Sequence, residues 1–246
     1  MIMTYCVNCH KKQDDVGSPL KVCSICKSVK YCSADCQKSH WSSHKATCTR
    51  EGCQQLIRAI DNDDMNTVTR LAKTKRILNG KVGYTPIPKK GCRDPYEMGD
   101  WTALHECVRK ENTVAMKILI DNGVKLDMKD VDGETPTFVA ATSKGPEPVR
   151  LLLKAGANPN SMGGDGWTCI MVAARSGNYG TTKALLDAGA DLYLGRDMFG
   201  RTAMDISSQQ ASGQMGLRMS EGESPDSAMA RHKRVAALLA EYADRC

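Results

Sequence analysis

Hydrophobic and polar positions in the larger, C-terminal part of the chain follow a pattern with a period of about 33 residues. Threonines recur at intervals of 33, 33 and 34 residues, at Thr102, Thr135, Thr168 and Thr202. Small apolar residues follow each threonine, and leucine pairs such as Leu152–Leu153 and Leu185–Leu186 stand further on. Self-similarity at this period is typical of a solenoid, in which each repeat packs only on its neighbours.

The local chemistry of each unit predicts a pair of helices. A threonine hydroxyl can accept a backbone N–H at the start of the first helix. A glycine after each leucine pair can end the second helix, and Asp-Gly at 132–133 and 165–166 turns the chain back. The phrases DGETPTFVAA, DGWTCIMVAA and LLLKAGANPN resemble the ankyrin repeat. This resemblance implies a mainly α fold, an ankyrin-repeat solenoid of about five repeats.

Repeat boundaries follow from the same alignment. The distance from Leu56 to Leu71 equals that from Leu104 to Leu119, so a first repeat stands directly after the N-terminal segment. We predict an ankyrin domain over 51–246, with repeats at about 52–100, 101–133, 134–166, 167–200 and 201–246.

Two insertions interrupt this pattern. Leu56 and Leu104 are 48 residues apart rather than 33, which predicts an insertion at 77–99. We expect this insertion to fold over the concave face or to extend the binding site. A polar stretch with little periodicity predicts a second insertion at 207–225, and the amphipathic helix that follows completes the fifth repeat.

Cysteines are concentrated at the N-terminus, where seven of the 12 fall within the first 48 residues. With one histidine they form four close pairs: Cys6/Cys9, Cys23/Cys26, Cys32/Cys36 and His44/Cys48. Close pairs suit tetrahedral zinc because two ligands near in sequence reach one ion at little loop-closure cost. The four pairs therefore predict two structural zinc ions with four protein ligands each, which leaves no open position for catalysis.

The division of the pairs between the ions follows in part from helix geometry. Residues 33–47 lack Pro and Gly and begin with Ser33, which predicts a helix. Cys36 and His44 would then lie about 12 Å apart along its axis. Ligands of one zinc lie within roughly 4–5 Å of one another, so these two residues serve different ions. Spacing alone does not assign the first two pairs. His40 is the nearest alternative to His44, and we expect it to pack or to face solvent.

The spacing C-x2-C…C-x2-C…YC-x3-C-Q…HW-x2-H-x3-C resembles the MYND-type zinc finger. The resemblance implies a cross-braced finger over 1–50, in which the first and third pairs share one ion and the second and fourth pairs share the other. The implied sets are Cys6, Cys9, Cys32, Cys36 and Cys23, Cys26, His44, Cys48. It also implies a shallow groove for short proline-containing peptides, lined by Ser24, Gln37 and Trp41. The alternative for Trp41 is packing within the finger.

Residues next to the repeat threonines are candidates for a second binding surface. Tryptophan is over-represented in interfaces, and we expect partner contacts on the concave face from Trp101, Trp167, Arg201, Asp130 and Asp197. The alternative is that these side chains pack on the next hairpin.

Composition restricts the function further. The net charge of +6 falls when seven thiolates bind zinc, so a nucleic-acid partner is not expected. The sequence has neither a run of about 20 apolar residues nor the apolar core of a signal peptide, which predicts a cytoplasmic or nuclear monomer without membrane contact. Glycine-rich nucleotide loops, HExxH and nucleophile elbows are absent. We expect a non-catalytic adaptor in transcriptional or signalling regulation. The alternatives are a regulatory module of a SET-type methyltransferase complex and a nucleic-acid-associated regulator.

Overall fold

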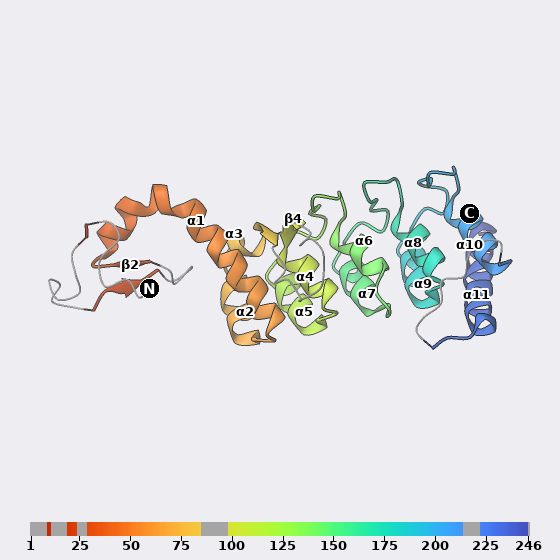
Figure 1. Cartoon of the computed structure of the whole chain (residues 1–246), viewed down its shortest axis with the longest axis horizontal. Helices are drawn as coiled ribbons and strands as arrows, with labels where there is room; N and C mark the ends of the chain where they lie inside the picture. The colour runs from red at the N-terminus through yellow and green to blue at the C-terminus, as the bar shows by residue number, and fades with distance from the viewer. Residues whose placement is uncertain (1–8, 11–18, 24–28, 85–97, 214–221, 246) are drawn as a thin grey trace.

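The computed structural model shows an elongated stack of helix pairs with a small finger at its N-terminal end (Figure 1). The structure describes residues 9–10, 19–23, 29–84, 98–213 and 222–245. The stack therefore has the solenoid architecture that the 33-residue period predicts.

Eleven helices lie within the described residues, and ten of them form five consecutive pairs. The first helix of each pair is α1 (Ala34–Asp61), α4 (Ala103–Arg109), α6 (Pro136–Ala141), α8 (Cys169–Ser176) or α10 (Ala203–Ala211). The second is α2 (Met65–Ala72), α5 (Thr113–Asp121), α7 (Glu147–Lys154), α9 (Tyr179–Asp187) or α11 (Pro225–Ala243). The short helix α3 (Lys75–Leu78) follows the first pair.

The repeat threonines cap the first helix of pairs two to five, as the sequence predicts. The hydroxyl of each accepts the backbone N–H of the residue three positions later, at Thr102, Thr135, Thr168 and Thr202. Glycines in the left-handed region, such as Gly123 and Gly156, follow the second helices. One continuous apolar core, built from both helices of every pair, holds the stack together.

Helix α1 is longer than the sequence predicts. The predicted helix over 33–47 is present and has the expected cap, since Cys36 N donates to Ser33 Oγ over 3.2 Å. The helix does not end there but continues to Asp61, so that it has 28 residues in all and becomes the first helix of the first repeat. It crosses the predicted domain boundary at 50/51 without a break, because its buried residues continue from the finger into the ankyrin core.

Residues at the edges of both predicted insertions belong to helices or strands, so each insertion is shorter than predicted. Ile77 and Leu78 of α3 are buried in the core, and β3 (Lys81–Tyr84) pairs antiparallel with β4 (Met98–Thr102). Residues 85–97 lie outside the described part of the chain, so the expectation that this insertion folds over the concave face stays a prediction. In the second insertion, α10 extends through 207–211 with Ser207 and Gln210 buried. Because some of the residues that face the core are polar, the apolar periodicity of the sequence does not predict this part of the helix.

The described part of the finger contains a short hairpin and the N-terminal half of α1. Strand β1 (Lys21–Val22) pairs antiparallel with β2 (Lys30–Tyr31). Among the described residues, the core of the finger contains Leu20, Tyr31 and the two thiols of Cys23 and Cys48. A core of this size gives little hydrophobic stabilisation, so the finger depends on another source of folding free energy.

Candidate zinc centre and partner-binding surfaces

The structure brings the described cysteines and His44 of the finger into two groups. One group is Cys9, Cys32 and Cys36, and the other is Cys23, His44 and Cys48. Within each group the ligand atoms lie within 4.8 Å of one another. The first group has Sγ–Sγ distances of 3.5 Å (Cys9 to Cys32) and 3.4 Å (Cys32 to Cys36). In the second, Cys23 Sγ and Cys48 Sγ are 3.6 Å apart.

These groups follow the cross-braced arrangement expected of the two ions. Cys32 and Cys36 come from the end of β2 and the first turn of α1, whereas His44 and Cys48 lie two to three turns further along the same helix. Helix α1 therefore keeps the third and fourth pairs apart, as the helix-length argument requires. Cys6 and Cys26, the remaining member of each predicted set, lie outside the described residues.

The donor set fits structural zinc. Thiolate sulfur and imidazole nitrogen are the ligands that zinc prefers in closed structural sites. Cys23 and Cys48 are fully buried against each other without a disulfide, an arrangement that a thiolate-bound cation stabilises. Burial of the imidazole and the neighbouring His40 lower the pKa of His44, which favours the neutral form that binds metal.

His40 has a different role from His44. Its Nδ1 lies 3.0 Å from the hydroxyl of Tyr31, and its ring stacks on that of His44 with centroids 5.5 Å apart. The side chain thus packs inside the finger, in agreement with the expectation that it is not a ligand.

The predicted peptide groove is described only in part. Gln37 is half-buried in the first turns of α1, and Trp41 follows one turn later on the same helix. The Trp41 side chain and Ser24 lie outside the described part of the molecule. The peptide-binding assignment of these three residues stays a prediction.

Trp101 is not available to a partner. Only 3% of its surface is exposed, and its Nε1 donates to Glu106 Oε2 over 2.9 Å. Its ring packs on His105 with centroids 4.9 Å apart. The partner-binding prediction for this residue is wrong because the β3–β4 hairpin brings the indole into the core.

Asp130 and Asp197 are also internal. Asp130 Oδ1 accepts the backbone N–H groups of Asp132 and Glu134, at 3.0 and 2.9 Å. Asp197 Oδ1 accepts those of Phe199 and Arg201 in the same way, at 2.9 and 3.0 Å. Each carboxylate closes its own hairpin and is buried, so the prediction that these two residues contact a partner is wrong. An aspartate that bonds backbone two and four residues later is a recognisable turn signal.

Arg201 is held by its neighbours but keeps part of its surface exposed, so its partner contact stays a prediction. Its Nη2 and Nε donate to Asp197 Oδ2 at 2.5 and 2.8 Å, and its Nη1 donates to Gln209 Oε1 at 2.9 Å. The guanidinium also lies over the Phe199 ring, 4.6 Å from the centroid. The side chain thus supports the last hairpin and fixes an exposed aromatic ring.

An exposed apolar row remains on the hairpin tips. Val131, Met198 and Phe199 are 54%, 88% and 72% exposed, and Trp167 is half-buried between them in sequence. Arg175 lies over the Trp167 ring, 5.2 Å from its centroid. In Figure 1 these hairpins form the upper edge of the stack, above α6, α8 and α10. We refer to these four apolar side chains as the tip row.

Carboxylates surround part of the tip row. Burial, with the charges of Asp130, Asp132 and Asp165, raises the pKa of Glu134 to about 7. Within the described residues, none of these four carboxylates forms an ion pair with a Lys, Arg or His side chain. Within the described residues, the hairpins that carry Glu134 and Asp165 therefore hold negative charge that no basic side chain pairs, beside apolar side chains.

His105 links two repeats, as its place in the TALH phrase predicts. Its Nε2 donates to the backbone oxygen of Glu134 over 3.2 Å, while Nδ1 lies 2.8 Å from Thr102 Oγ1. Burial lowers the pKa of this imidazole, so it stays neutral and serves both contacts. The role is structural.

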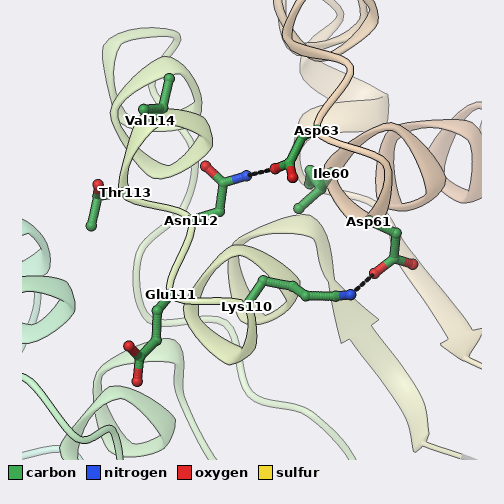
Figure 2. A pocket seen from close by; sticks show the side chains of 8 residues that line it. All are labelled: Ile60, Asp61, Asp63, Lys110, Glu111, Asn112, Thr113 and Val114. Carbon is green, nitrogen blue, oxygen red and sulfur yellow. Dashed lines mark hydrogen bonds and ion pairs between the residues drawn. The ribbon is translucent and has the colours of Figure 1, made fainter.

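A pocket of about 330 Å³ lies at the opposite edge, between the helix–helix loops of repeats 1 and 2 (Figure 2). Asn112 Nδ2 donates to Asp63 Oδ1 over 2.7 Å, and Lys110 Nζ lies 3.2 Å from Asp61 Oδ1. Figure 2 shows both bonds crossing from one loop to the other. These two bonds across the pocket fasten the end of α1 to the second repeat.

Comparisons with known proteins agree with this fold. Residues 56–163 and 146–216 match ankyrin repeats (three copies) and together span more than half of the chain. The chain belongs to the ankyrin-repeat family. Residues 6–48 match the MYND finger, so a MYND finger precedes the repeats and implies structural zinc. Both are non-catalytic interaction modules.

Several curated proteins share part of the sequence. The inactive serine/threonine-protein kinase TEX14 of Bos taurus is 40% identical over 91 residues, which are 37% of this chain and 6% of that protein. Ankyrin repeat and SOCS box protein 11 of Homo sapiens is 32% identical over 121 residues, 48% of this chain and 36% of that protein. SET domain-containing protein 14 of Caenorhabditis elegans is 31% identical over 88 residues, which are 35% of this chain and 19% of that protein. The chain spans about a third of these relatives' length or less.

None of the described helices combines the length and apolar character needed to cross a bilayer.

Proposed function

We propose that this protein joins two other proteins, with the MYND finger binding a proline-containing peptide and the ankyrin stack binding a second partner through the tip row. The observation that carries the proposal is the row of exposed apolar side chains beside unpaired carboxylates. Exposed aromatic and methionine side chains are enriched in interfaces, and each apolar contact gains from exclusion of water.

The charge around the tip row favours one kind of partner. Glu134, Asp132 and Asp165 repel one another, and a basic side chain of a partner would relieve this repulsion. We therefore propose a partner segment that combines an apolar anchor with Lys or Arg. The apolar anchor would contact Trp167 and Phe199. The basic residues would face the carboxylates of Glu134, Asp132 and Asp165.

The finger contributes a scaffold and a separate binding surface in this proposal. Two zinc ions, one in each ligand group, would complete their coordination with Cys6 and Cys26. Gln37, Trp41 and Ser24 would form the peptide groove. We propose a cytoplasmic or nuclear location, where such thiol ligands stay reduced.

Affinity capture tests the two surfaces separately. Four zinc-loaded proteins serve as bait: wild type, Trp41→Ala, Trp167→Ala and the control Val114→Ala. Val114 is 57% exposed on the opposite edge of the stack, so its loss should change nothing. We expect Trp41→Ala and Trp167→Ala to lose different proteins. If both variants recover everything that wild type recovers, the two proposed surfaces are wrong.

A second candidate is a regulatory role in a methyltransferase complex. The observation that favours it is the similarity to SET domain-containing protein 14. Capture of lysine methyltransferase activity by wild type, with loss in Trp41→Ala, supports this candidate. Capture of proteins without such activity refutes it.

A further inference from the structure

The first ankyrin repeat lacks the cap that the other repeats have. In pairs two to five, a threonine hydroxyl caps the first helix. Leu56 corresponds to Leu104, so the position of Thr102 corresponds to Gln54 in the first repeat. Gln54 lies inside α1, not before it.

Two further equivalences support this alignment. Asp63 and Glu111, also 48 positions apart, both adopt a left-handed backbone, with φ of 54° and 52°. The next residues, Asp64 and Asn112, both cap the second helix of their repeat. The first two repeats therefore superpose residue by residue around Gln54, and the missing threonine is not an error of register.

The cap that serves the first repeat lies in the finger instead. Ser33, 21 residues before Gln54, caps α1, and zinc-ligand candidates follow on the helix at Cys36, His44 and Cys48. Every fourth residue from His44 to Ile60 is buried, namely His44, Cys48, Gly52, Leu56 and Ile60. One buried row thus runs from the ligand group into the ankyrin core.

The middle of α1 does not favour a helix by itself. Thr47, Thr49 and Gly52 have low helix propensity, with Gly about 1 kcal/mol less favourable than Ala. The helix is therefore held from its two ends. The C-terminal end is fixed by the core and by the bonds from Asp61 and Asp63 to the second repeat. The N-terminal end is fixed by the finger.

The finger depends on metal for its own fold. Its core contains Leu20 and Tyr31 beside two of the buried ligand thiols. In modules of this kind, metal-binding free energy is folding free energy. A terminal repeat also has only one neighbouring repeat to stabilise it. Without the folded finger, the first turn of its helix would begin at an arbitrary residue and leave backbone N–H groups without partners.

We propose that zinc binding by the finger sets the stability of the first ankyrin repeat, because the only cap of its first helix lies in the finger. Metal loading in the finger then acts through α1 on the first repeat and leaves the later repeats unchanged. This inference does not depend on which partner binds.

Hydrogen exchange of the full chain tests the coupling. Protection of a peptide over 53–72 is compared with that of a control peptide over 169–187 in the fourth repeat, before and after zinc chelation. We expect exchange over 53–72 to become faster, on the order of tenfold, as loss of one N-cap predicts. The control peptide should not change. Unchanged protection over 53–72, or an equal loss in the fourth repeat, would overturn the proposal.

Three variants separate the coupling from an effect of the chelator. Cys23→Ser removes a ligand that lies outside α1 and should reproduce the loss over 53–72 without chelation. Gln54→Thr gives the first repeat its own cap and should restore most of the protection in chelated protein. Arg58→Thr adds a threonine at an exposed position of the same helix and should restore none. If Gln54→Thr and Arg58→Thr behave alike, the missing cap is not the cause.

Discussion

Replacement of Glu134 by glutamine should stabilise the protein above neutral pH. The pKa of this carboxyl is about 7 in the folded protein against an ordinary value of 4.5, because burial and three neighbouring carboxylates disfavour its charge. The folded state therefore binds more protons than the unfolded state between these two values, and stability falls as the pH rises through this window. Glutamine keeps the shape of the protonated form and removes the charge.

The size of the effect follows from this difference in pKa. The full difference corresponds to about 3.4 kcal/mol at pH 8.5. Glu134 is half-exposed, so solvent screening reduces this to about 1 kcal/mol. For a domain of this size, that stabilisation raises Tm by roughly 2–4 °C.

The assay is thermal unfolding of the zinc-loaded chain at pH 5.5 and 8.5. The Tm of Glu134→Gln should exceed that of wild type at pH 8.5, and the difference in Tm should be smaller at pH 5.5. The control Glu147→Gln removes an exposed carboxylate that bonds Arg150 at 2.6 Å, and we expect a change within about 0.5 kcal/mol at either pH. If Glu134→Gln is no more stable than wild type at pH 8.5, the carboxylates do not repel one another as described.

Three further predictions concern other parts of the molecule. In urea unfolding, Gly177→Ala should destabilise the folded protein by about 1–3 kcal/mol, because φ is +64° and the new Cβ would lie 2.8 Å from His232 Cε1. The control Gly145→Ala has open space around the new Cβ and should leave stability unchanged. Trp101→Phe should cost about 1–3 kcal/mol in the same assay, because the buried Glu106 loses a hydrogen-bond donor. Native mass spectrometry should detect two zinc ions per chain, and a single ion would refute the assignment of two closed sites.

The repeat architecture was predictable because its signals are local. A threonine that caps a helix and a glycine that ends one act within a few residues, and both recur in register. The division of Cys36 and His44 between two groups followed from helix rise alone. These arguments need no knowledge of distant contacts.

The features that escaped prediction depend on contacts between distant segments. Trp101 is buried because β3 and β4 pair around a segment whose length concealed the hairpin. The continuation of α1 past Thr47 depends on packing against later repeats, which outweighs the low helix propensity of Gly52. Asp130 and Asp197 are different, because their turn signal was local and could have been recognised.

The continuous helix α1 also sets the geometry of any bivalent partner. From Cys36 to Leu56 it spans about 30 Å at 1.5 Å per residue, and the tip row lies on later repeats, further from the finger (Figure 1). A flexible segment of about 30 residues has a root-mean-square length equal to the helix span alone, so a segment that reaches the tip row must be longer. A partner that carries both binding motifs on such a longer segment would gain effective concentration at the second site, and one with a segment of about 30 residues or fewer would gain little. The rigid helix thus selects partners by the spacing of their motifs as well as by sequence.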